Sequence, residues 1–126
     1  MILLALNELN LDFIKGYIGQ GKLTHFGKLL EQGVVNTTSE EKYELLEPWI
    51  QWATVQTGKT YDEHQVFRLG DMVNRPDLHQ IFENLEKSGL SVGAISPFNA
   101  DNRLASSKFF IPDPWTQTKT SGGYIL

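Results

Sequence analysis

The sequence predicts an α/β domain with a parallel sheet and flanking helices. Residues 2–6 and 90–95 form short, continuous apolar runs, which are typical of strands buried on both faces of a parallel sheet. Between these runs, apolar residues recur at helical spacing in several segments. Strands that alternate with helices in this way indicate right-handed crossovers between parallel strands.

The first expected strand, residues 2–6, is followed by two expected helices. The first helix begins after Asn10 and the second covers residues 23–30, where Gly33 supplies a stop. Val34 and Val35 then predict a short strand that leads into an exposed polar loop.

The second half of the chain predicts two more helices and a strand. Pro48 suits the first turn of a helix, because its missing N–H has no helical partner there, and Gly58 ends that helix. Residues 59–75 have no clear period. Pro76 is expected to open a helix that extends to Gly89, before the strand at residues 90–95.

Composition excludes several classes of function. The 126 residues are 40% hydrophobic and 21% charged, which indicates an ordinary globular protein. The formal net charge is -4 and the basic residues are scattered, so nucleic acid is not an expected partner. Because there is no cysteine, any metal in this stretch must have oxygen or imidazole ligands.

The two ends of the sequence carry further expectations. The apolar run after Met1 is too short for a signal segment or a membrane span, so we expect a cytoplasmic protein without a membrane partner. Residues 112–126 contain turn residues followed by what reads as the start of a new element. We therefore expect residues 1–126 to be the N-terminal part of a single, incomplete α/β domain that tends to self-associate.

One segment resembles a known family. Residues 47–66 are similar to the part of the alkaline phosphatase superfamily, which includes type I phosphodiesterases and sulfatases, where the nucleophile opens a helix. In the family that helix ends in Thr-Gly and a His-Gly pair follows. Residues 3–8 match the first family strand with its acidic metal ligand, and residues 76–95 match the next unit. The segment reads Glu-Pro-Trp-Ile-Gln-Trp-Ala-Thr-Val-Gln-Thr-Gly-Lys-Thr-Tyr-Asp-Glu-His-Gln-Val.

The resemblance implies a metal-dependent phosphoester or sulfoester hydrolase or transferase that acts on a small phosphate or sulfate ester. It implies divalent metal ions, Zn, Mn, Mg or Ca, with Glu8 and Asn7 as the matching ligands. The family nucleophile position falls on Pro48, which has no hydroxyl, and Gln65 replaces the glycine after His64. The alternative is therefore a catalytically altered relative that binds a phosphorylated or sugar ligand without cleaving it.

The residues also predict where a ligand lies. In an open α/β sheet the crevice forms beyond the carboxyl ends of the strands, and the helix that starts at Pro48 is expected to aim its N-terminus there. We expect Glu47 and the N–H groups of Trp49 and Ile50 to take part in anion binding, close to Asn7 and Glu8.

His64 and the small number of metal ligands bear on function as well. His64 is interpreted as a structural hydrogen-bonding residue, since a lone imidazole makes a poor metal site. The chain offers few metal ligands, so we expect it to be inactive in isolation. A generic nucleotide-binding module is a third option, which the lack of a glycine-rich phosphate motif weakens.

Overall fold

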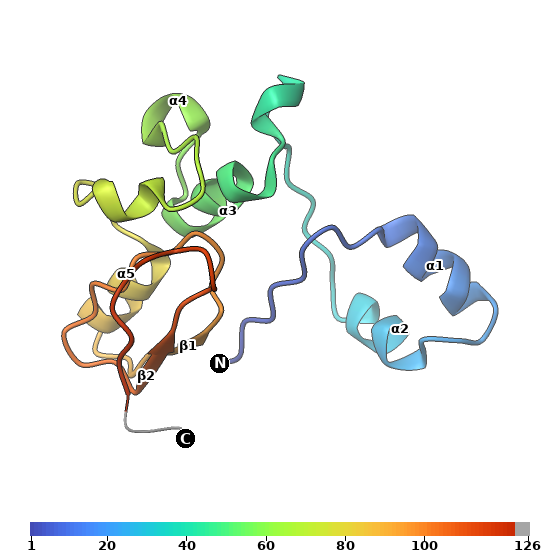
Figure 1. The fold of residues 1–126 in the computed structure, drawn as a ribbon. Coiled ribbons are helices and arrows are strands. Elements are labelled where there is room, and N and C mark those ends of the chain that lie inside the picture. The colour runs from blue at the N-terminus through green and yellow to red at the C-terminus, as the bar shows by residue number, and fades with distance from the viewer. Residues whose placement is uncertain (123–126) are drawn as a thin grey trace. The chain divides into compact units, whose positions relative to one another are not determined.

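The computed structural model describes residues 1–122 (Figure 1). The chain divides into two compact units, Met1–Thr38 and Ser39–Leu126, and each is described by itself. The expectation of a single domain over residues 1–126 stays a prediction.

The first unit contains two helices, α1 (Leu11–Gly19) and α2 (Thr24–Glu31). Asn10 caps α1, because its Oδ1 accepts hydrogen bonds from the N–H groups of Asp12 and Phe13, both at 3.0 Å. Both helices lie where the apolar spacing predicts them. Among the described residues of this unit, Ile14 alone is buried, so the helix pair encloses little core.

Two expected strands of the first unit are not formed. Residues 2–6 and the segment around Val34 and Val35 have no strand pairing, and Ile2 and Val35 are 95% and 90% exposed. A strand exists only where a neighbouring segment accepts and donates its backbone hydrogen bonds, and the described part of this unit supplies none. The prediction of paired strands here is therefore wrong for this structure.

The second unit begins with helical elements. A 3₁₀ turn, η1 (Tyr43–Leu45), precedes α3 (Pro48–Thr57). Helix α3 has proline at its first position and ends at Gly58, whose left-handed φ of 67° suits glycine, so its prediction is confirmed. Two short elements follow where no period was visible, α4 (Tyr61–His64) and η2 (Asp71–Asn74).

Helix α5 (Ile81–Lys87) begins later than the sequence predicts. Pro76 lies in a turn, and the helix starts after Gln80, whose N–H donates to the Glu83 carboxylate at 2.9 Å. The side chain of Gln80 is held by the backbone of Asp101, with bonds of 2.8 and 3.0 Å. These contacts fix the start of the helix five residues after the proline that was expected to open it.

Two strands form a parallel sheet, β1 (Gly93–Ile95) and β2 (Phe109–Ile111), with Ala94 opposite Phe110. Strand β1 lies within the predicted segment 90–95, whereas β2 was not predicted. The chain is therefore a mixed α/β structure with parallel pairing, as expected. On the other side of β2, Phe110 forms an antiparallel bridge with Ser121.

The core of the second unit has two buried clusters. One combines α3 with the segments after it, and the other joins the sheet to α5, which lies against the strands in Figure 1. In the second cluster Phe82 of α5 meets Phe110 edge to face, with ring centroids 5.8 Å apart. The buried residues are Ala53, Val66, Met72 and Leu78 in the first cluster and Ala94, Ala100 and Phe110 in the second.

Candidate functional site at the carboxyl ends of the strands

The loops that follow β1 and β2 are joined at one edge of the sheet. Because the strands are parallel, the segments after β1 and β2 both leave the sheet at the same edge, where α/β proteins hold their ligands. The N–H of Asn99, after β1, donates to Oδ2 of Asp113, after β2, at 2.9 Å. The two loops therefore form one structure.

Asn99 connects this edge to α3. Its side chain is fully buried and its backbone is left-handed, with a φ of 50°, a conformation that asparagine tolerates better than most residues. Its Oδ1 accepts from the N–H of Gly70 at 2.8 Å, and its Nδ2 donates to the carbonyl of Trp49 at 2.8 Å. The first turn of α3 thus lies beside the loop that follows β1.

Asp113 is a buried carboxylate whose acceptors are fully occupied. It is 2% exposed and accepts from the N–H groups of Asn99, Trp115 and Thr116, and from the hydroxyl of Thr116. A carboxylate with this many donors is stable in a buried site and holds the loop after β2 in shape. Asp113 is therefore a residue that positions the edge.

The predicted residues around the start of α3 have different surroundings. Glu47 is exposed and its side chain makes no capping bond. The indole N–H of Trp49 donates to the Phe67 carbonyl at 3.0 Å. The backbone N–H of Trp49 has no backbone acceptor among the described residues. Pro48 contributes neither a hydroxyl nor an N–H.

The backbone N–H of Ile50 is not free to bind an anion, contrary to the prediction. Ile50 is fully buried, and its N–H donates to the carbonyl of Glu47 at 2.9 Å. This tight first turn satisfies one of the helix N–H groups that were expected to be free. Of the two amides predicted to bind an anion, that of Trp49 remains.

Asn7 and Glu8 lie in the other unit, in an exposed turn directly after the apolar residues 2–6. Glu8 has a φ of 54°, which is uncommon for a residue other than glycine and which marks positions worth testing for function. Their proximity to Glu47 stays a prediction.

His64 is buried and engaged at both ring nitrogens. Its Nδ1 accepts from the N–H of Val66 at 2.9 Å, so in the neutral ring the proton must be on Nε2, which faces Oγ1 of Thr54 at 3.0 Å. Burial lowers the pKa of His64 and favours this neutral form. Since Nε2 donates to the hydroxyl, the imidazole is not a base for Thr54.

The hydroxyl of Thr57 also has a structural contact. Its Oγ1 donates to the Ala53 carbonyl one turn earlier, at 2.7 Å, in the last turn of α3. Together with the tautomer of His64, this bond leaves α3 without an activated hydroxyl nucleophile.

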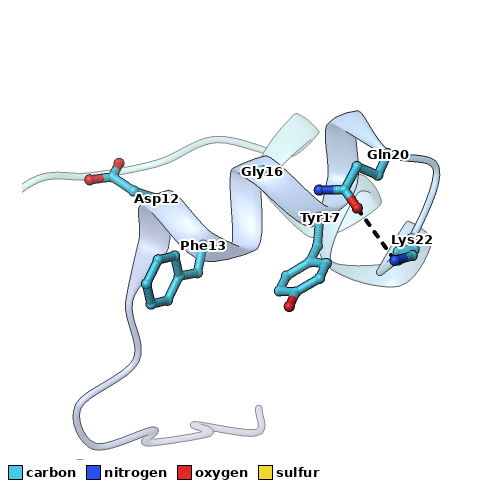
Figure 2. A pocket seen from close by; sticks show the side chains of 6 residues that line it. All are labelled: Asp12, Phe13, Gly16, Tyr17, Gln20 and Lys22. Carbon is cyan, nitrogen blue, oxygen red and sulfur yellow. Dashed lines mark hydrogen bonds between the residues drawn. The ribbon is translucent and has the colours of Figure 1, made fainter.

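Two surface hollows are found among the described residues. The one in Figure 2 has a volume of about 500 Å³ and is lined by a single helix and the turn after it. The rings of Phe13 and Tyr17 lie on the same side of α1, the carboxylate of Asp12 points away from them, and Lys22 bonds to Gln20 at 3.3 Å. No buried polar group of the described residues lines this hollow, so it lacks the features of a catalytic site.

The second hollow, of about 800 Å³, contains Arg103 and Lys119. The guanidinium of Arg103 is already bound by the carboxylate of Asp101 at 2.6 Å and by the carbonyls of Leu78 and Met72, both at 2.7 Å. These bonds hold three of the five guanidinium N–H donors on acceptors of the protein itself.

Within residues 1–122, no three His, Asp or Glu side chains come together in a group that suits a metal ion. No helix in the described part of the chain is both long and apolar enough to cross a membrane.

Asn99 and Asp113 were not identified from the sequence. The signal for Asn99 is its place just after the predicted strand 90–95, at the end where functional residues are expected. Asp113 lies between two prolines in a turn-rich segment, and its partner strand β2 was not recognised. Recognition of residues 109–111 as a strand would have indicated both loops.

No protein-family profile, curated protein or solved structure matches this chain.

Proposed function

We propose that the chain belongs to the α/β domain of a metal-dependent phosphoester or sulfoester hydrolase or transferase-like protein, as its resemblance to the alkaline phosphatase superfamily implies, and that the chain alone is inactive. The observation that carries this proposal is the bond from Asn99 to the Trp49 carbonyl. It puts the start of α3 at the carboxyl edge of a parallel sheet, the arrangement in which α/β proteins bind anionic ligands.

The charges at this helix start support a role for a cation. The N–H of Trp49 and the positive end of the α3 dipole favour an anion, whereas the uncapped carboxylate of Glu47 repels one. A divalent ion, Zn, Mn, Mg or Ca, between Glu47 and the anion removes this conflict. Glu8 and Asn7, in the other unit, remain the metal ligands that the resemblance implies.

Exposed apolar segments support the view that further elements complete the sheet. Residues 2–6 have no regular secondary structure and are solvent-exposed, and Ile95 on β1 is 69% exposed. A parallel sheet is normally covered on both faces and a bare edge invites pairing. We therefore expect the isolated chain to self-associate.

The second candidate function is a relative that binds a phosphorylated or sugar ligand without cleaving it. The observation that favours it is the lack of a nucleophile in α3, where Pro48 has no hydroxyl and Thr54 and Thr57 are held by structural bonds. Covalent catalysis needs an activated hydroxyl at this position. Binding of the anion does not.

The experiment measures hydrolysis and phosphate binding side by side. The full chain is incubated with p-nitrophenyl phosphate or p-nitrophenyl sulfate and with Zn²⁺, Mn²⁺, Mg²⁺ or Ca²⁺, and inorganic phosphate binding is followed by calorimetry with and without Mn²⁺. We expect no turnover, and phosphate binding only when the metal is present. Robust turnover that Glu8→Ala abolishes contradicts the expected inactivity.

Matched variants test the residues. Glu47→Gln is expected to remove the metal-dependent phosphate binding, whereas Glu44→Gln, which changes an exposed carboxylate in η1, is expected to retain it. Phosphate binding that ignores both metal and Glu47 contradicts the proposed site.

A further inference from the structure

Residues 65–68 follow α4 and contact the start of α3. The carbonyl of Phe67 accepts from the indole N–H of Trp49 at 3.0 Å. Val66, in the same segment, is fully buried and belongs to the first core cluster. The position of this segment therefore determines the surroundings of Trp49.

His64 fixes the beginning of this segment. Its Nδ1 accepts from the buried N–H of Val66 at 2.9 Å, while its Nε2–H donates to Oγ1 of Thr54 in α3 at 3.0 Å. Gln65, which lies between His64 and Val66, has a left-handed φ of 51°, a strained conformation for a residue other than glycine. The bond to Val66 thus closes a strained turn, and loss of this bond lets the turn relax.

Protonation of the imidazole removes the bond to Val66. The neutral ring has its proton on Nε2 and a lone pair on Nδ1, whereas the imidazolium has an N–H at both positions. A proton on Nδ1 faces the N–H of Val66, so two donors meet without an acceptor between them. Because a buried donor without an acceptor is unfavourable, the protonated form favours an arrangement in which the N–H of Val66 reaches solvent.

The surroundings of His64 determine the pH at which the proton enters. Burial has the largest effect and lowers the pKa of His64. Glu40, which precedes η1, and Glu63, in α4, raise this pKa, whereas Arg75, which follows η2, lowers it. The ring of Tyr61 packs edge to face against the imidazole, with centroids 5.7 Å apart. Since the net shift is downward, the ring is neutral above the ordinary pKa of 6.5 and takes up the proton below it.

We propose that His64 is an acid-sensitive switch for the start of α3. In neutral solution Nδ1 holds the N–H of Val66, and the Phe67 carbonyl stays on the indole of Trp49. When a proton from solvent occupies Nδ1, residues 65–68 move and the indole of Trp49 is released. The switch itself is independent of the proposed function. Its effect on ligand binding rests on that function, because Trp49 supplies the backbone N–H proposed to bind the anion.

NMR spectra of the full chain from pH 8 to pH 5 test the switch. We expect the ring signals of His64 to titrate below pH 6.5 and the indole N–H signal of Trp49 to shift with the same midpoint. The amide signals of Ala94 and Phe110, which are paired in the sheet, should keep their positions. A Trp49 signal that stays constant while His64 titrates overturns the proposal, as does a His64 ring that is still neutral at pH 5. Simultaneous unfolding of the sheet also overturns it, because the change is then not local.

Substitutions separate the switch from general effects of acid. His64→Asn keeps an acceptor near the position of Nδ1 but takes up no proton, so the Trp49 signal should become independent of pH. Glu40→Gln removes a charge that raises the pKa of His64, so the midpoints of His64 and Trp49 should move together to lower pH. This variant keeps an oxygen for the N–H of Tyr61, which Glu40 now accepts at 2.7 Å, so it should fold even if His64→Asn does not.

Glu41→Gln, at the adjacent exposed carboxylate, is the matched control and should leave both midpoints unchanged. Equal shifts in Glu40→Gln and Glu41→Gln overturn the proposal.

The effect on ligand binding is measured separately. The Mn²⁺-dependent affinity for inorganic phosphate should fall more from pH 8 to pH 5 in the parent chain than in His64→Asn, because the released Trp49 is less well ordered for binding. Phosphate binding in neither chain contradicts the proposed function, while the signals of His64 and Trp49 still decide the switch. Equal falls in both chains contradict the effect on binding alone.

Discussion

The side-chain amide of Asn99 donates a hydrogen bond to the main-chain carbonyl of Trp49 at 2.8 Å, although the two residues are 50 positions apart in the sequence. This bond ties the loop after β1 to the first turn of α3. The Asn99 side chain also accepts from the N–H of Gly70, and its backbone N–H donates to Asp113, so four segments of the second unit meet at this buried residue. The location of the candidate site follows from this arrangement.

Replacement of Asn99 should therefore destabilise the second unit strongly. Asn99→Ala removes the acceptor for the N–H of Gly70 and the donor to the Trp49 carbonyl. The free energy of unfolding is expected to fall by about 2–4 kcal/mol. Urea denaturation measures this loss. Asn84→Ala, at an exposed position of α5, is the control and should change stability by less than about 0.5 kcal/mol. Similar values for the two variants contradict the role of Asn99.

The stability of the second unit should fall as the pH drops through the range in which histidine titrates. Burial lowers the pKa of His64 in the folded state, so the unfolded chain binds the proton more readily. Stability is therefore full above the ordinary pKa of 6.5 and is lost below it. The loss is at most about 1.4 kcal/mol per pH unit for one proton. Urea unfolding from pH 8 to pH 5 measures it.

The charged groups that act on His64 come from different segments. Burial has the largest effect and lowers the pKa of His64. Glu40 and Glu63 raise this pKa and Arg75 lowers it, and the net shift is downward. His64→Asn, which keeps an acceptor near the position of Nδ1, should flatten the pH dependence. His79→Asn, at an exposed position, should retain it. A parent chain whose stability is constant from pH 8 to pH 5 contradicts the neutral, buried imidazole.

Asp77 should titrate at a distinctly low pH. The side-chain hydrogen bond from Arg75 lowers the pKa of Asp77 from 3.8 to about 2. Carboxyl ¹³C titration by NMR should find this value, and Arg75→Gln should return it towards 3.8 because the donor is lost. Any stability that the pair gives is present above the ordinary pKa and disappears as the pH falls towards 2. Lys59→Gln, a change of the same charge elsewhere, should leave the titration of Asp77 unchanged.

The register of the sheet can be tested at Gly93. A methyl group at this position would lie 2.5 Å from the ring of Phe109, its partner on β2, so Gly93→Ala should cost about 1–3 kcal/mol in stability. In a Phe109→Ala background the ring is absent, and the same substitution should cost less than about 0.5 kcal/mol. An equal cost in both backgrounds, measured by urea unfolding, contradicts the pairing of these two residues.

The sequence predicts the helices of this fold better than its strands. Apolar spacing and terminal residues such as Asn10, Pro48 and Gly58 act locally, so α1 and α3 lie where they are expected. Strands depend on a partner, and residues 2–6 have none in the described structure. The predicted start of α5 at Pro76 is wrong for the same reason, because contacts of Gln80 with the distant Asp101 set the start of this helix.

In the candidate site, too, the sequence predicts features set by general architecture but not those set by contacts between distant residues. The importance of the edge after residue 95 follows from the general architecture of α/β sheets, which the sequence predicts. The identities of Asn99 and Asp113 as the residues that join the edge depend on contacts across 14 to 50 positions. The engaged N–H of Ile50 depends on a tight first turn that composition does not reveal.

The most direct measurement of the central claim uses Mn²⁺ as a paramagnetic probe of the full chain. In ¹H–¹⁵N spectra, substoichiometric Mn²⁺ with inorganic phosphate should broaden the amide signal of Trp49 most strongly, because signals close to the bound ion relax fastest. Glu47→Gln should remove this broadening, and Glu44→Gln should preserve it. Broadening centred on other acidic segments, such as Glu40 and Glu41, with Trp49 unchanged, would contradict a metal and anion site at the start of α3.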